Sequence, residues 1–263
     1  MSKTIAVLNR KGGVGKTATA HALGAGLSLR GYKTLFIDLY SQCNLSYSLD
    51  ALQRPLSSME ILTKTATAEE AIARTEGGDI IPASPSLALA DKVIDGKRKE
   101  YRLREALEPL SSKYDYIVID TPPALGVLST NALTASDLII IPSMADAYSL
   151  QGIGLLFEAI QAVKRYTNPS LEVEGILLTR YKGRAILPRD MKENAEGIAE
   201  EIGTKVFDTP IRECIAIQEA QARQKDIYSY DKRSNATADY NAFLDELLGV
   251  KKSTKKRFFK NHR

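Results

Sequence analysis

Short apolar runs alternate with longer stretches of helical periodicity along most of this chain. Several runs are nearly continuous in Ile, Val and Leu, which is typical of parallel strands that are covered on both faces. Strands that alternate with helices in this way indicate crossover connections. We therefore predict one α/β domain with a twisted, mostly parallel sheet and helices on both faces. The predicted strands are Thr4–Asn9, Thr34–Asp38, Asp79–Ile81, Tyr116–Asp120, Leu138–Pro142, Val173–Thr179 and Lys205–Phe207.

Three stretches predict helices most clearly. Ala18–Leu29 follows the first strand and its loop, Leu150–Lys164 is amphipathic, and Ala236–Leu248 is the last stretch with helical periodicity. The composition changes sharply only near Gly249, after which Lys and Arg dominate. We predict a domain over residues 1–249 and a basic tail over residues 250–263.

The composition is that of an ordinary globular protein. The 263 residues are 44% hydrophobic and 26% charged, which suits one α/β domain with a full core. No apolar run approaches the roughly 18 residues of a membrane-spanning helix. The N-terminus enters a strand without a signal-peptide pattern, and Cys43 and Cys214 lack metal-ligand spacing. We expect a cytoplasmic protein without a disulfide.

The net charge of +4 comes from the C-terminal tail. Residues 251–263 hold seven Lys and Arg and no acidic residue, which leaves 29 of the 36 basic residues against all 32 acidic ones. Any contact of the domain with DNA must therefore use a local patch. We interpret the tail as a disordered basic arm, with DNA phosphates or an anionic membrane as alternative targets.

A glycine-rich loop, Asn9–Thr17, separates the first predicted strand from the first helix. Strand, glycine-rich turn and helix N-terminus in this order are typical of a phosphate-binding P-loop. The glycines allow the backbone to curl round a polyphosphate and point successive N–H groups inward. Lys16 supplies a cation for the β- and γ-phosphates, and Thr17 supplies a hydroxyl for Mg²⁺.

Two predicted strands end in a carboxylate. Asp38 ends the second strand, and Asp120 ends the run Tyr116–Ile119 in the arrangement of a Walker B motif. Because the carboxyl ends of parallel strands meet at one edge of a sheet, both side chains are candidates to hold Mg²⁺ or its water ligands.

The loop departs from the common P-loop pattern, because Arg10 stands where the first glycine is usual and Lys11 is an additional lysine. The sequence Lys-Gly-Gly-Val-Gly-Lys-Thr (residues 11–17) resembles the deviant Walker A motif of the ParA/MinD family of ATPases. The resemblance implies that Lys11 reaches across a nucleotide-sandwich homodimer to the phosphates bound by the other subunit. It implies ATP-binding residues Lys11, Gly12, Gly13, Val14, Gly15, Lys16, Thr17 and Ala18, and Mg²⁺ held by Thr17, Asp38 and Asp120.

Residues 38–44 resemble the family's Asp-x-Asp-Pro-Gln-x-Asn segment, and Asp38, Gln42 and Asn44 match it. Tyr40 stands where the family has the Asp that positions and activates the attacking water. A tyrosine stays protonated at neutral pH and cannot accept the water's proton, and loss of a general base costs ~10²–10⁴-fold in rate. We expect ATP binding to survive and hydrolysis to be weak. Three explanations of Tyr40 stay open. Turnover is naturally slow, or Tyr40 is an engineered or accidental change, or another residue fills the role of the base.

Three further segments extend the resemblance. Thr121-Pro122-Pro123 resembles switch II, residues 79–91 are similar to the family's Ile-Pro-x-x-x-x-Leu segment, and residues 210–220, which begin with Pro210, are similar to the loop and helix that close over the adenine. Relatives bind DNA non-specifically through basic residues of the C-terminal part, although one aligned basic position falls on Glu213. The candidates here are Arg180, Lys182, Arg184, Arg189, Arg212, Arg223 and Lys225.

These observations predict a ParA-type partition ATPase that dimerises round ATP–Mg²⁺, binds DNA on the nucleoid, and segregates a plasmid, mobile element or chromosome. A ParB-like centromere-binding partner would stimulate its turnover. Three alternatives stay open: a MinD-like regulator that cycles on membranes, an ATP-locked DNA-binding or repressor module, and a P-loop metabolic enzyme. Stable membrane anchoring is not expected, because the tail holds only two apolar residues, Phe258 and Phe259.

Overall fold

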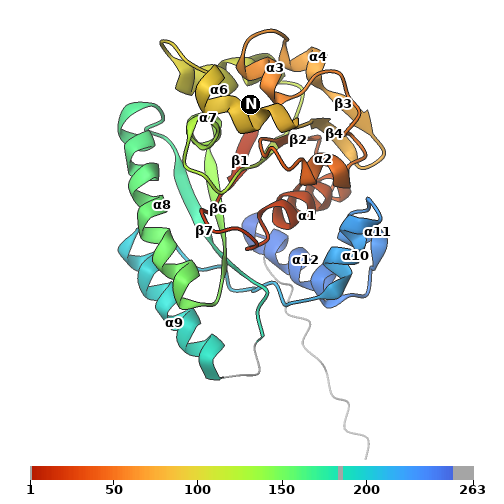
Figure 1. Ribbon diagram of the computed structural model, residues 1–263. Helices are drawn as coiled ribbons and strands as arrows, with labels where there is room; N and C mark the ends of the chain where they lie inside the picture. Colours follow the sequence, from red (N-terminus) through yellow and green to blue (C-terminus); the bar gives the residue numbers. More distant parts are fainter. Residues whose placement is uncertain (1, 183–185, 251–263) are drawn as a thin grey trace, which may run out of the picture.

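One twisted sheet runs through the centre of the molecule in the computed structural model, which describes residues 2–182 and 186–250 (Figure 1). Within these residues the strand order is β3-β4-β2-β5-β1-β6-β7, and every neighbouring pair is parallel except β3 and β4. The strands are β1 Lys3–Val7, β2 Thr34–Asp38, β3 Ala73–Thr75, β4 Gly78–Ile81, β5 Tyr116–Asp120, β6 Leu138–Met144 and β7 Glu172–Thr179.

Helices form the connections between the strands. The α-helices are α1 Lys16–Leu29, α2 Asn44–Ser48, α3 Ser58–Leu62, α4 Ala68–Ala71, α5 Ala90–Val93, α6 Arg102–Leu107, α7 Val127–Ala135, α8 Ala147–Tyr166, α9 Ile186–Glu201, α10 Ile215–Ala222, α11 Ile227–Tyr230 and α12 Asn235–Leu247. Three short 3-10 helices are η1 Pro85–Leu89, η2 Lys99–Tyr101 and η3 Glu108–Leu110. Within the described residues, no helix combines the length and apolarity needed to cross a bilayer.

The helices cover both faces of the sheet because successive strand residues point to opposite sides. Ile5 and Val7 of β1 pack in one core with α1, α10, α11 and α12. Ala6, between them, packs in a second core with α3, α5, α6 and α7. A third core joins the outer strands β6 and β7 to α8 and α9, which lie side by side in Figure 1.

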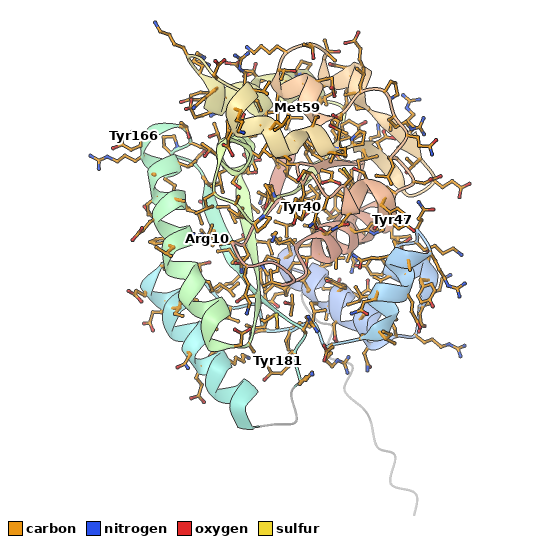
Figure 2. The ribbon with its side chains drawn as sticks, in the orientation of Figure 1. Arg10, Tyr40, Tyr47, Met59, Tyr166 and Tyr181 are labelled. Atoms are coloured by element: carbon orange, nitrogen blue, oxygen red, sulfur yellow. The ribbon has the colours of Figure 1, made fainter. Side chains whose placement is uncertain are left out.

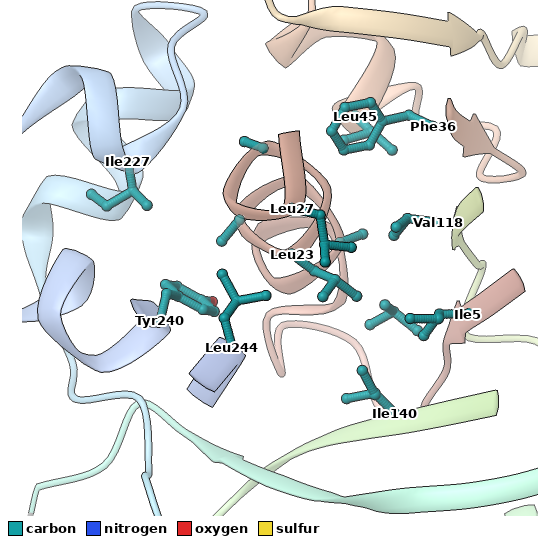
Figure 3. Packing of buried hydrophobic residues seen from close by; sticks show 14 of the residues in the cluster. Ile5, Leu23, Leu27, Phe36, Leu45, Val118, Ile140, Ile227, Tyr240 and Leu244 are labelled. Atoms are coloured by element: carbon teal, nitrogen blue, oxygen red, sulfur yellow. The ribbon is translucent and has the colours of Figure 1, made fainter. Parts of the chain in front are cut away.

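Helix α1 lies between the sheet and the C-terminal helices (Figure 3). Leu23 and Leu27 face the strands, and Leu244 packs on the helix from α12. The helix approaches β2 so closely that a Cβ on Gly24 would lie 2.1 Å from the Phe36 ring. This packing fixes the N-terminus of α1 relative to the sheet edge, where the glycine-rich loop lies.

The predicted α/β architecture is confirmed, and most predicted strands and helices are present with small shifts at their ends. The predicted strand Lys205–Phe207 is wrong, because only Val206 forms a bridge, with Ile176, before the chain turns away. The short antiparallel strand β3 and the helix α9 were not predicted. β3 has three residues, too few for a periodic pattern, and it is recognisable only from its pairing with β4.

Candidate nucleotide site

The glycine-rich loop between β1 and α1 is shaped to receive an anion. Gly13 and Gly15 have φ of 75° and 86°, a left-handed conformation that favours glycine. Gly15 caps α1 without any side-chain hydrogen bond, and the first turn of the helix holds no acidic residue. The first N–H groups of a helix have no partner within it and carry the positive end of its dipole. The loop therefore offers these N–H groups to a phosphate.

Buried side chains hold this loop in place. Asn9 is fully buried, donates from Nδ2 to the carbonyl of Pro142 in β6 (2.7 Å), and accepts from the backbone N–H of Lys11 (3.0 Å). Thr179, at the end of β7, donates to the carbonyl of Val14 (2.8 Å). Both anchors were missed in the sequence, because nothing in the local pattern shows which distant strand an Asn or Thr will contact.

The two lysines of the motif point to different partners. Lys16 is buried, and its Nζ donates to the carbonyl of Lys11 (3.1 Å) inside the loop. Burial lowers the pKa of the Lys16 ammonium, and the charge of Asp120 opposes this shift. Lys11 instead extends to Asp146, in the connection between β6 and α8, and donates to both carboxylate oxygens (2.9 and 3.0 Å). Only Lys16 is thus directed into the loop of its own chain.

The structure brings the two predicted carboxylates together. Asp38 and Asp120 are paired residues in the register of β2 and β5, and both are fully buried. Thr17 donates its hydroxyl to Oδ2 of Asp120 (2.6 Å). The other oxygen, Oδ1, is buried and has no hydrogen-bond partner among the described residues. Both oxygens of Asp38 accept hydrogen bonds, from the backbone of Tyr40 and from the backbone and hydroxyl of Ser46.

The electrostatics of this pair favour a cation. Burial, and the neighbouring charge of Asp38, raise the pKa of Asp120 to about 8. Burial also raises the pKa of Asp38, although its hydrogen bonds oppose this shift. A divalent cation would neutralise both carboxylates, and the unpartnered Oδ1 of Asp120 suits an oxygen-coordinated Mg²⁺ or its water. The described residues hold no cluster of three His, Cys, Asp or Glu side chains for a metal.

A cavity of about 160 Å³ opens beside the loop. Ala18 lines this cavity, and so does Ile211, the residue that follows Pro210. Cys214 also lines the cavity, and it and Cys43 are free thiols. The remaining lining residues are Gly13, Gly15, Thr179, Arg180, Arg212, Glu213, Ile217, Gln218, Gln221 and Tyr240.

Tyr40 lies in the connection that follows β2, near the centre of the view in Figure 2. Its backbone N–H donates to Asp38 (3.0 Å), and its carbonyl accepts from Cys43 (2.8 Å). The side chain is half-buried. The backbone turn that follows Asp38 is therefore complete without a carboxylate at position 40.

The predicted DNA-binding residues divide into groups. Arg180 and Lys182 both pair with Glu213 at 2.8 Å, near the cavity beside the glycine-rich loop. Arg212 forms a bidentate pair with Asp239 of α12, so its guanidinium already serves the packing of that segment. Arg223 and Lys225 are exposed after α10. Arg184 and the side chain of Arg189 lie outside the described residues.

Comparisons with known proteins identify the family of this chain. A family model described as "AAA domain" matches residues 2–173. A chromosome partitioning protein ParA from Myxococcus xanthus is 35% identical over 94% of this chain and 88% of its own length. The sporulation initiation inhibitor protein Soj from Bacillus subtilis is 37% identical over 91% of this chain and 96% of its own. The chain belongs to the ParA/MinD family of P-loop ATPases.

A solved member of the same fold shows which ligands this architecture accepts elsewhere. Cobyrinic acid a,c-diamide synthase from Mycobacterium smegmatis, with bound ADP and magnesium, is 32% identical over 94% of each chain, with a TM-score of 0.82. The predicted family and fold are thereby confirmed for this ParA/MinD-family chain.

Proposed function

We propose that this protein is a partition ATPase that binds ATP with Mg²⁺, dimerises round two nucleotides and then binds DNA non-specifically. The observation that carries the proposal is the divergence of the two lysines. Lys16 points into its own loop, whereas Lys11 leaves it for Asp146. A lysine directed away from its own phosphate loop can reach the phosphates of a second subunit once its present contacts open.

Nucleotide binding follows from the loop and its neighbours. The backbone of Gly12–Ala18 and the ammonium of Lys16 would hold the phosphates, and the cavity beside the glycine-rich loop would take part of the nucleoside. The residues that would hold Mg²⁺ are Thr17, Asp120 and Asp38. When bound, Mg²⁺ neutralises phosphate charge. The buried, unpartnered oxygen of Asp120 supports this assignment.

Dimerisation requires the Lys11–Asp146 pair to open, and the pair is weak enough to do so. Both side chains are about one-third exposed, and ion pairs of that kind contribute about 0–1 kcal/mol. Phosphates on a second subunit offer several charge-assisted hydrogen bonds in exchange, each worth about 1.5–3 kcal/mol. The exchange therefore favours the dimer while nucleotide phosphates are bound.

The test compares the oligomeric state with and without ATP–Mg²⁺. We expect a monomer without nucleotide and a dimer with it, together with DNA binding that weakens steeply as salt rises. Lys11→Ala should retain ATP binding and lose the dimer. The matched control is Lys3→Ala, because Lys3 is exposed and lies at the amino end of β1, away from the glycine-rich loop. Equal DNA binding without nucleotide, or a dimer that survives Lys11→Ala, would refute the proposal.

Partner and location follow from the same proposal. A ParB-like protein that binds a centromere site would stimulate ATP turnover. The ATP-bound form of the chain described here would be located on the nucleoid. The partition and Soj relatives support this assignment. A MinD-like membrane cycle is the competing reading, and flotation with liposomes, with and without residues 251–263, distinguishes the two.

A metabolic function is the second candidate, and the similarity to the synthase favours it. ATP turnover that DNA and a partition partner leave unchanged, but that a small-molecule acceptor stimulates, would identify an enzyme of that class.

A further inference from the structure

A second cavity is lined by residues of the α3–α4 segment and of the α6 region. Figure 1 shows α3, α4 and α6 at the top of the molecule. Its volume is about 450 Å³, within the roughly 300–1,000 Å³ of small-ligand pockets. None of its lining residues lines the cavity beside the P-loop. They are Ile61, Lys64, Thr65, Ala66, Thr67, Ala68, Glu69, Glu70, Arg102, Glu105, Ala106 and Pro109.

Arg102 is the unusual member of this lining. Its Nε is buried and has no hydrogen-bond acceptor, and no described residue forms an ion pair with its guanidinium. A buried donor without a partner costs about 1–3 kcal/mol, so native proteins rarely retain one. Arg102 thus lines a cavity large enough to admit an anion, and its Nε has no acceptor among the described residues.

The backbone at Arg102 is held from a neighbouring helix. Asn131, buried in α7, donates to the carbonyl of Lys99 (2.9 Å) and accepts from the N–H of Leu103 (3.0 Å). These bonds bracket Arg102 at the start of α6. A side chain that starts from a fixed backbone loses less entropy when it binds a ligand.

The acidic residues of the lining already have partners. Glu105 pairs with Lys64 (2.9 Å) and with Arg98 (2.8 Å), which lies outside the lining. Glu70 accepts from the N–H and the hydroxyl of Thr67, and Glu69 lies 3.4 Å from the Nζ of Lys113. Intramolecular pairing therefore leaves the charge of Arg102 available.

We propose that this cavity binds a carboxylate joined to an apolar group, with Arg102 as its ion-pair partner. The planar guanidinium matches a carboxylate in a bidentate geometry, and Ile61, Ala68, Ala106 and Pro109 offer apolar contacts. Three glutamates in the same lining disfavour a phosphate dianion, because like charges repel it more strongly than a monoanion. The ligand is either a free acid or the Glu side chain of a partner's segment.

The test uses the full chain with isotope-labelled arginine, and follows the Nε–H resonance of Arg102 by NMR. Isovalerate, isovaleramide, inorganic phosphate and the peptide acetyl-Leu-Glu-Ala-amide are each titrated to millimolar concentrations. We expect a saturable shift with isovalerate that is at least ~10-fold weaker with the uncharged amide. A tighter response to the peptide assigns the site to a partner's segment, and a weaker one assigns it to a free acid.

Two variants make the result specific. Arg102→Gln lacks the Nε–H group that the titration follows, so its response to isovalerate is measured by isothermal titration calorimetry, as is that of the wild type. The response should be lost while the melting temperature stays equal or rises, because the unpartnered donor is removed. Arg104→Gln, on the same helix but outside the lining, should bind as the wild type does. The proposal is overturned by a response that is absent, equal for isovaleramide, equal for phosphate, or retained in Arg102→Gln.

Discussion

At the scale of single residues, we expect Tyr40 to limit the turnover rate of the proposed ATPase. Its backbone completes the turn after Asp38, but its side chain offers no carboxylate. We predict that Tyr40→Asp raises ATP turnover by at least ~10-fold, because a general base becomes available to the attacking water. Steady-state phosphate release measures this effect. Tyr40→Phe, which adds no base, should leave turnover unchanged, and an unchanged rate in Tyr40→Asp would assign the role elsewhere.

His21 makes a second residue-scale prediction, because it is buried in α1 beside the Phe36 ring. Burial lowers its pKa from 6.5 to about 4, against the attraction of Asp226. Below pH 6.5 the unfolded chain therefore binds a proton that the folded chain excludes. The free energy of unfolding should fall by on the order of 2–3 kcal/mol between pH 6.5 and 4 through this group. His21→Leu should reduce that fall in urea titrations, and an identical pH dependence would refute the assignment.

At the scale of elements, α7 takes its N-terminal cap from a different helix. Oδ1 of Asp91 in α5 accepts the N–H of Val127, the first residue of α7 (2.7 Å). This bond joins the segment after β4 to the end of the connection that begins with Thr121-Pro122-Pro123, the residues that resemble switch II. We predict that Asp91→Ala lowers the free energy of unfolding by about 0.5–2 kcal/mol, as the loss of a cap does. Chemical denaturation measures it, and the exposed Asp95→Ala serves as the control with no change.

Local sequence patterns explain which elements were predictable. β2 and β5 have the same ends in the sequence and in the structure, because both are short apolar runs that finish at an aspartate. The segment Lys205–Phe207 is also apolar in part, but it only bridges to β7 through Val206. Whether this segment forms a strand depends on how many residues of β7 run alongside it, and the local sequence does not determine that number.

At the scale of the whole molecule, we expect the pair Lys11–Asp146 to oppose the proposed dimerisation. We predict that Asp146→Asn lowers the ATP concentration at which the dimer forms by roughly 2–5-fold, since a pair worth about 0–1 kcal/mol no longer competes. Sedimentation at a series of ATP concentrations measures this. Asp137→Asn, at the amino end of β6, is a control for loss of charge. A dimer that needs more ATP would show that Asp146 contributes to the interface instead.

DNA binding should respond to Glu213, which pairs with both Arg180 and Lys182. Glu213→Gln leaves these cations unpaired, and we predict at least ~3-fold tighter DNA binding at low salt with a steeper salt dependence. Fluorescence anisotropy with a DNA duplex measures both. Asp208→Asn, nearby in the same connection, is the matched control. Unchanged affinity in Glu213→Gln would remove Arg180 and Lys182 from the DNA surface.

The phosphate loop, the two strand-end carboxylates and the α/β architecture were all determined by the sequence alone. Their signals are local: apolar runs, glycines at fixed spacing, and an aspartate at the end of a strand. Tertiary structure alone decided that Asn9 and Thr179 anchor the loop, that Lys11 meets Asp146, and that Arg102 lines a cavity while its Nε has no partner among the described residues. Each of these depends on contacts between residues distant in the chain, and only packing brings such residues together.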